Sequence, residues 1–152
     1  MLKIAHRGNT NGPSPRENHP FYIEEAMSRG FDVEIDVWMV NQNLWLGHDK
    51  PQYMTSKTFL DRYKDKLWIH CKNLAALEYF VKLKTEYRHF WHENDDHTLT
   101  SNGLIWTYPG KPVTDQSILV IKDSVLPAEY INAFGICSDY VGSMPNETID
   151  NH

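Results

Sequence analysis

Hydrophobic and acidic residues alternate most regularly in the stretch Phe-Asp-Val-Glu-Ile-Asp-Val-Trp-Met-Val early in the chain. Successive side chains of a strand point to opposite faces, so Val33, Ile35 and Val37 share one face. Glu34 and Asp36 then lie side by side on the other face. The pattern predicts a strand with an apolar face toward the core and two neighbouring carboxylates on its opposite face.

Similar patterns predict the other elements of the chain. Further strands are expected at residues 2–7, 44–48, 67–72, 88–93, 104–108, 117–121 and 135–139. Helices are expected to begin near residue 18 and end at Gly30, and to cover residues 56–64, 74–86 and 127–134. The segment 94–102 is polar and is expected to be a loop. Strands that alternate with helices indicate an α/β fold with a mainly parallel sheet.

Composition limits the classes of protein that this chain can belong to. With 152 residues, 41% of them apolar, residues 1–152 are expected to form one domain. The formal net charge of −5 argues against a nucleic-acid-binding surface. No apolar run reaches the roughly 18 residues of a membrane span, and the first strand leaves no room for a signal peptide. We therefore expect a cytoplasmic protein, with Cys71 and Cys137 as buried free thiols.

The two carboxylates point to a metal site. Side by side on one strand face, Glu34 and Asp36 repel each other, and hard oxygen ligands suit Mg²⁺, Ca²⁺ or Mn²⁺. A solvated strand face would give the same pattern. His6 and Arg7 end the preceding strand, however, and His48 follows a few residues later. Histidines at the ends of neighbouring strands beside a carboxylate pair favour a functional site that holds one divalent cation.

Four short motifs in order resemble a known family. The motifs are His6-Arg7-Gly8, Glu17-Asn18, Glu34-x-Asp36 and His48-Asp49. They resemble the glycerophosphodiester phosphodiesterase family, part of a wider group that includes the phosphatidylinositol-specific phospholipases C. The match is dense over residues 4–49 and weak beyond them. The resemblance implies a TIM-like barrel whose site lies at the C-terminal ends of the strands.

The chain departs from that family in its length. A (β/α)₈ barrel typically needs about 250 residues, and this chain has 152. We therefore expect a trimmed TIM-like (β/α) barrel with fewer helices than strands, in which loops replace helices between His92 and Pro127. A flank without helices would be covered by a second subunit, so a homo-oligomer is expected.

The second departure is His70, which stands where the family places an acidic metal ligand, two residues before Lys72. A neutral imidazole in that place removes a negative charge and brings Zn²⁺ into consideration beside Mg²⁺, Ca²⁺ and Mn²⁺. Glu93 is a further candidate to complete the metal shell. Glu17 is another candidate contact to metal or substrate, although an acid at a helix N-terminus is also favourable with the helix dipole.

Phosphodiester hydrolysis needs an electrophilic phosphorus, a deprotonated nucleophile and a protonated leaving group. A cation on the two acids would meet the first need, and His6 and His48 suit the other two in an order that the sequence leaves open. Arg7 and Lys72 are candidate phosphate ligands, with ion pairs to the acids as their alternative.

The sequence thus favours a metal-dependent phosphodiesterase that acts on a small phosphodiester such as a glycerophosphodiester. Attack by water and attack by a neighbouring substrate hydroxyl, which gives a cyclic phosphate, both stay open. The alternative is a barrel that binds phosphate or a phosphodiester but has lost turnover. The short length and His70 favour that alternative, while the retained pair His6 and His48 argues against it.

Overall fold

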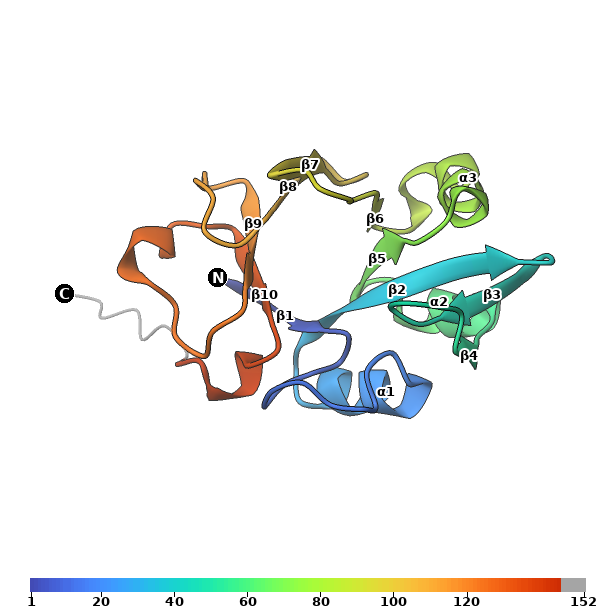
Figure 1. The fold of residues 1–152 in the computed structure, drawn as a ribbon, viewed down its shortest axis with the longest axis horizontal. Coiled ribbons are helices and arrows are strands. Elements are labelled where there is room, and N and C mark those ends of the chain that lie inside the picture. The colour runs from blue at the N-terminus through green and yellow to red at the C-terminus, as the bar shows by residue number, and fades with distance from the viewer. Residues whose placement is uncertain (146–152) are drawn as a thin grey trace.

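The structure, a computed structural model, describes residues 1–145. A curled mixed sheet of ten strands forms a half-barrel at its centre (Figure 1). The strands are β1 (Leu2–His6), β2 (Asp32–Val40), β3 (Asn43–Leu46), β4 (Tyr53–Met54), β5 (Leu67–Cys71), β6 (His89–Phe90), β7 (His97–Leu99), β8 (Ile105–Thr107), β9 (Ser117–Ile121) and β10 (Gly135–Ser138). The helices are α1 (Pro20–Ser28), α2 (Lys57–Tyr63) and α3 (Leu74–Lys82), with 3₁₀ turns η1 (Lys84–Glu86), η2 (Ala128–Tyr130) and η3 (Val141–Ser143).

Strand β2 is the longest strand and joins two parts of the sheet. It is parallel to β1 on one side and to β5 on the other, with His6 opposite Glu34 and His70 opposite Asp36. The parallel path continues from β1 to β10, β9 and β8, while β6 extends the sheet beyond β5. This register brings the C-terminal ends of β1 and β5 beside the part of β2 that carries Glu34 and Asp36.

The expected trimmed TIM-like (β/α) barrel is wrong, because the strands form a mixed half-barrel. Most strand pairings are parallel, as expected, but not all of them. Strands β3, β4 and β7 are antiparallel to their neighbours, and only three α-helices occur in residues 1–145. A helical crossover between parallel strands needs about a dozen residues or more. The links at 91–96, 100–104 and 108–116 are shorter than that. The chain therefore builds hairpins and turns where a TIM barrel would place helices.

The N-termini of the helices follow from local sequence. Pro20 occupies the first turn of α1, and the ring of His19 accepts the backbone N–H of Phe21 as the N-cap. Ser56 and Asn73 cap α2 and α3 in the same way. The predicted helices near these residues are therefore confirmed. The helix expected at 127–134 is only the 3₁₀ turn η2.

Alternation along the strands separates two apolar layers. Val33, Ile35 and Val37 of β2 lie on the outer face of the curled sheet. They are completely buried in the larger core, which also contains residues of the helices. The inner layer fills the curl of the sheet and consists of Ile4, Trp68, Phe90, Leu104, Trp106, Ile118 and Cys137. Cys71 and Cys137 are both buried and free, as expected.

The three helices lie on the side of β2 and β5, and none lies beside β8 and β9 (Figure 1). On that other flank Val125, Ile131 and Phe134 are exposed apolar residues. The expectation that a second subunit covers this flank stays a prediction. Within residues 1–145, none of the helices has the length and apolar character that a membrane crossing requires.

Candidate active site

Polar side chains on the inner face end most of the parallel strands at one edge of the half-barrel, above the apolar layer. Each lies two residues after an inward-facing residue of the same strand, which is the period of a strand. Together they line a pocket of about 150 Å³. Its lining residues are His6, Arg7, Glu34, Asp36, His48, His70, Phe90, His92, Trp106, Tyr108, Pro109, Val120 and Lys122.

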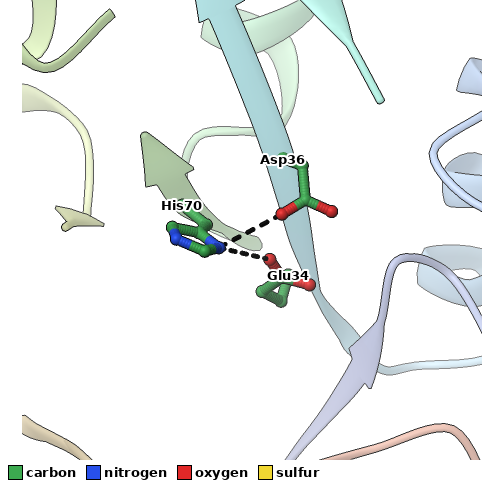
Figure 2. Close-up of side chains that lie close together, drawn as sticks. All are labelled: Glu34, Asp36 and His70. Carbon is green, nitrogen blue, oxygen red and sulfur yellow. Dashed lines mark ion pairs between the residues drawn. The ribbon is translucent and has the colours of Figure 1, made fainter. Parts of the chain in front are cut away.

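Glu34, Asp36 and His70 form the centre of one wall of this pocket. The two acids project from β2 and His70 projects from β5, and all three point toward one another (Figure 2). The Nδ1 atom of His70 lies 3.2 Å from Asp36 Oδ1 and 4.0 Å from Glu34 Oε1. One ligand atom from each residue lies within 4.8 Å of the others, the only such metal-compatible group in the described residues.

A hydrogen bond from Nε2 of His70 limits the possible states of Nδ1, the ring nitrogen that faces the two acids. The Nε2 atom is 3.1 Å from the backbone carbonyl of His92. A carbonyl can only accept, so Nε2 carries a proton. Nδ1 then holds either a second proton, as an imidazolium paired with the acids, or a lone pair that binds a cation. A metal-binding histidine usually donates its other N–H to a carbonyl or carboxylate in this way.

The two acids are buried and differ in their electrostatics. Glu34 is 2% exposed and Asp36 is 1% exposed. Burial and the charge of Asp36 raise the pKa of Glu34 above its usual value. Burial also favours the neutral form of Asp36, but the adjacent His48, His70 and Arg7 lower its pKa well below the usual range. A cation in the space between the acids would relieve the penalty on Glu34.

Buried atoms without partners support the same conclusion. In residues 1–145, Glu34 Oε2 and Asp36 Oδ1 make no hydrogen bond to the protein. Buried polar atoms without partners are costly and uncommon, and each one requires an explanation. Two oxygens and one nitrogen are a donor set that suits a divalent cation such as Mn²⁺, Mg²⁺ or Zn²⁺.

Asn18 holds Asp36 in place. Its amide nitrogen donates to Asp36 Oδ2 at 2.9 Å, and its amide oxygen accepts the backbone N–H of Asp36 at 3.0 Å. Asn18 is 1% exposed and has a φ of 62°, a left-handed conformation that asparagine tolerates better than most residues. Asn18 therefore orients the acid without facing the pocket.

We expect Asn18→Ala to lower the free energy of unfolding by about 2–3 kcal/mol, because it leaves a buried N–H and a buried carboxylate oxygen without partners. It should also weaken divalent-cation binding. Chemical denaturation and calorimetric titration measure the two effects. Asn41 has a similar φ of 48° but is exposed, so Asn41→Ala is the control for backbone strain alone. Equal losses in both variants would contradict the role given to Asn18.

Arg7 connects Asp36 to two further residues. Its Nε lies 3.4 Å from Asp36 Oδ2, and its Nη1 donates to Glu17 Oε2 at 3.2 Å. Its Nη2 lies 3.2 Å from His48 Nε2. A guanidinium can only donate, so His48 Nε2 accepts and the His48 proton resides on Nδ1, 3.6 Å from Asp36 Oδ2. Glu17 thus contacts Arg7 and does not belong to the metal-compatible group.

His6 stands on the other side of Glu34. Its Nδ1 is 2.9 Å from Asp139 Oδ1, and its Nε2 is 3.7 Å from Glu34 Oε2. Asn9 donates to both Asp139 and Glu17. It thereby connects the acid that binds His6 with the acid that binds Arg7. Burial favours neutral His6, but the bond to Asp139 and the charge of Glu34 raise its pKa above the usual value.

The structure brings most of the expected site residues together. His6, Arg7, Glu34, Asp36, His48 and His70 all line the pocket. Lys72 and Glu93 do not line it. The backbone N–H of Lys72 bonds to the carbonyl of Val37, and Glu93 is exposed.

Sequence reasoning missed Lys122, Asp139 and Asn9. A usable signal existed for the first two. Lys122 follows the inward-facing Val120 by two residues, and Asp139 follows the inward-facing Cys137 by two residues. Continuing the strand period by one step would have placed both at the pocket edge. Asn9 lies in a loop, and no sequence pattern indicated its contacts.

Comparison with known proteins identifies no relative of this chain. No family model, no curated protein and no solved structure matches the chain. The arrangement must therefore be interpreted from its own geometry. It combines a cation-compatible donor set, two histidines and a guanidinium within one pocket. That is a set of groups suited to binding and polarising a phosphate ester.

Proposed function

We propose that the chain is a divalent-metal-dependent phosphodiesterase that acts on a small phosphodiester such as a glycerophosphodiester. One observation carries the proposal. Glu34, Asp36 and His70 converge within 4.8 Å, and each of the two acids has a further histidine beside it. The motif resemblance in residues 4–49 points in the same direction.

Glu34, Asp36 and Nδ1 of His70 would hold the cation. When bound, the cation supplies Lewis-acid polarisation of a phosphoryl oxygen. The protein's part is to fix the donors: β2 and β5 set their spacing, Asn18 orients Asp36, and the His92 carbonyl orients the ring of His70. Burial of both acids excludes competing water ligands and strengthens their attraction for a cation.

His6 is the better placed proton acceptor. Its bond to Asp139 occupies Nδ1, so Nε2 faces Glu34 and the pocket. An imidazole oriented by a carboxylate, with its other nitrogen free, is a common arrangement for general-base catalysis. Nε2 of His6 would take the proton from an attacking hydroxyl, either of water or of the substrate.

His48 would serve the leaving group once Arg7 has moved. In the structure Nε2 of His48 accepts from Arg7. A phosphate oxygen that pairs with Arg7 would compete for that guanidinium, because charge-assisted bonds to phosphate are stronger than bonds to a neutral imidazole. Nε2 of His48 would then be free to take up a proton from solvent and, from the resulting imidazolium, to give that proton to the leaving alkoxide.

Turnover of chelator-treated protein tests this function. Bis(p-nitrophenyl) phosphate and glycerophosphoglycerol are assayed with Mg²⁺, Ca²⁺, Mn²⁺ or Zn²⁺ added back. We expect metal-dependent release of the alcohol, and a loss of about 100-fold or more in His6→Ala. His97 is exposed and lies outside the pocket lining, so His97→Ala is the matched control. The product distinguishes the two nucleophiles, since attack by a substrate hydroxyl leaves a cyclic phosphate.

Two results would count against a metal-dependent enzyme. Substrate binding without turnover under every metal would support the non-catalytic phosphodiester-binding alternative. Equal activity in the presence of chelator and metal would mean that the acids do not act through a cation.

A further inference from the structure

The wall of the pocket beyond His70 is chemically different from the acidic wall. Its polar members are His92, Tyr108 and Lys122, which follow β6, β8 and β9. Trp106 and Val120 lie one strand period below Tyr108 and Lys122 and form its apolar base. These residues are not needed for the proton transfers proposed above.

A row of ring contacts runs from the acid group along this wall. The ring centroids of His70 and His92 are 5.8 Å apart, and those of His92 and Tyr108 are 6.4 Å apart. The ammonium of Lys122 lies 5.6 Å from the centroid of Tyr108. Lys122 therefore stands at the far end of the row, and it lines the same pocket as the acids.

Lys122 differs from the other cation of the pocket in its partners. Arg7 pairs with Glu17 and Asp36. Within residues 1–145, Lys122 has no carboxylate partner and makes only the contact with Tyr108. An unpaired surface lysine is ordinary, but this one lines the pocket. His92 adds a second polar group, because Asp95 binds its Nδ1 at 2.9 Å and fixes the ring.

We propose that His92, Tyr108 and Lys122 form a subsite for a second anionic group of the substrate. This proposal rests on the proposed function and narrows its substrate class. The substrate would be a phosphodiester in which one alcohol carries a carboxylate or a phosphomonoester. The ammonium of Lys122 supplies the charge and the hydroxyl of Tyr108 supplies a donor, while Asp95 holds the ring of His92 between them and the acids.

The same contacts disfavour a choline-like alcohol. Quaternary ammonium groups bind to aromatic faces, and Tyr108 is the exposed aromatic ring of this wall. Lys122 already lies near that ring. A second cation there would meet the lysine charge at short range, which costs free energy. The wall thus selects by charge against cationic alcohols and in favour of anionic ones.

A comparison of four substrates tests the subsite. The metal-loaded protein is assayed with glycerophosphoinositol 4-phosphate, glycerophosphoglycerate, glycerophosphoglycerol and glycerophosphocholine. We expect the highest kcat/KM for one of the two anionic alcohols, and the pair distinguishes a phosphomonoester from a carboxylate. Lys122→Ala should raise KM for that substrate about fivefold to tenfold, while KM for glycerophosphoglycerol changes less than about twofold. Lys122→Glu should reverse the preference toward the choline ester.

Lys111→Ala is the matched control, because Lys111 pairs with Asp96 and does not line the pocket. The subsite is wrong if the wild type hydrolyses the four esters without charge preference, or if Lys122→Ala affects the neutral ester as much as the anionic one. If no ester is hydrolysed, the proposed function fails, and the subsite is decided by calorimetric binding of the same four compounds. Tighter binding of an anionic ester that Lys122→Ala removes supports it, and equal binding of all four overturns it.

Discussion

Glu34→Gln should abolish metal binding and at the same time stabilise the metal-free protein. Glutamine keeps the shape of the side chain but removes one of the two carboxylates, so divalent-cation affinity should fall by at least about 100-fold. The same change removes a buried charge next to Asp36. We expect the free energy of unfolding of chelator-treated protein to rise by about 1 kcal/mol at pH 8. Functional sites often destabilise a fold, and substitutions that remove their buried charges can stabilise it.

The gain in stability should depend on pH in a defined direction. Burial and Asp36 raise the pKa of Glu34 in the folded state above its unfolded value of 4.5. The unfolded chain therefore loses this proton first as pH rises, and the folded state is penalised above its own higher pKa. The advantage of Glu34→Gln should be absent below the unfolded value of 4.5 and should grow as the pH rises through the higher folded pKa of Glu34.

Thermal denaturation across this pH range and calorimetric titration with Mn²⁺ measure both effects. Glu25 is an exposed acid paired with Arg16, so Glu25→Gln serves as the control and should change neither quantity appreciably. A Glu34→Gln variant that binds Mn²⁺ as tightly as the wild type would remove Glu34 from the metal site.

Asp139→Asn should shift the pH dependence of turnover to lower pH. His6 acts as a base only when it is neutral, so the rate should rise with pH through the pKa of His6. The hydrogen bond to Asp139 is a principal cause that raises this pKa. Asparagine can still accept the His6 N–H but carries no charge. The acidic limb of the rate profile should therefore move downward, and the maximal rate should fall by about 10-fold to 100-fold.

If Asp139 only supported the structure, Asp139→Asn would lower the rate without moving the acidic limb of the pH–rate profile. The profile therefore distinguishes a structural role from an effect on the pKa of His6. Asp115 is exposed and lies outside the pocket lining, which makes Asp115→Asn the control. His6→Ala should lose the limb altogether, with a fall in rate of about 100-fold to 10,000-fold. An unchanged limb in Asp139→Asn would show that another group is the base.

The sequence predicted local structure better than it predicted the arrangement of the sheet. Capping residues and apolar periodicity placed α1, α2 and α3 closely, because these signals act within a few residues. The alternation in residues 31–40 correctly separated the buried Val33 face from the acidic face. Strand pairing is a long-range property, and the antiparallel placement of β3, β4 and β7 was not anticipated. The short links after β6 were the physical reason against a (β/α) barrel, and they were already visible in the chain.

The site was predictable where motifs and strand ends coincided. His6 and His70 stand at or near the ends of their strands, and the alternation along β2 placed Glu34 and Asp36 together on one face. Lys72 was assigned to the pocket by analogy, but β5 ends at Cys71 and Lys72 does not line it. Asp139 and Asn9 were missed because their importance lies in contacts across the fold, with sequence separations of more than a hundred residues to their partners His6 and Asp139.

A metal site at Glu34, Asp36 and His70 is tested most directly by an anomalous difference map from a crystal of this protein grown with Mn²⁺. We expect a peak bonded to one oxygen of Glu34, one oxygen of Asp36 and Nδ1 of His70, with Nε2 of His70 still donating to the His92 carbonyl. A map without a peak at this position, in which Nδ1 of His70 stays about as close to Asp36 Oδ1 as the present 3.2 Å, would contradict this expectation. The three residues would then be a buried imidazolium and carboxylate cluster, and the phosphodiesterase proposal would lose its metal.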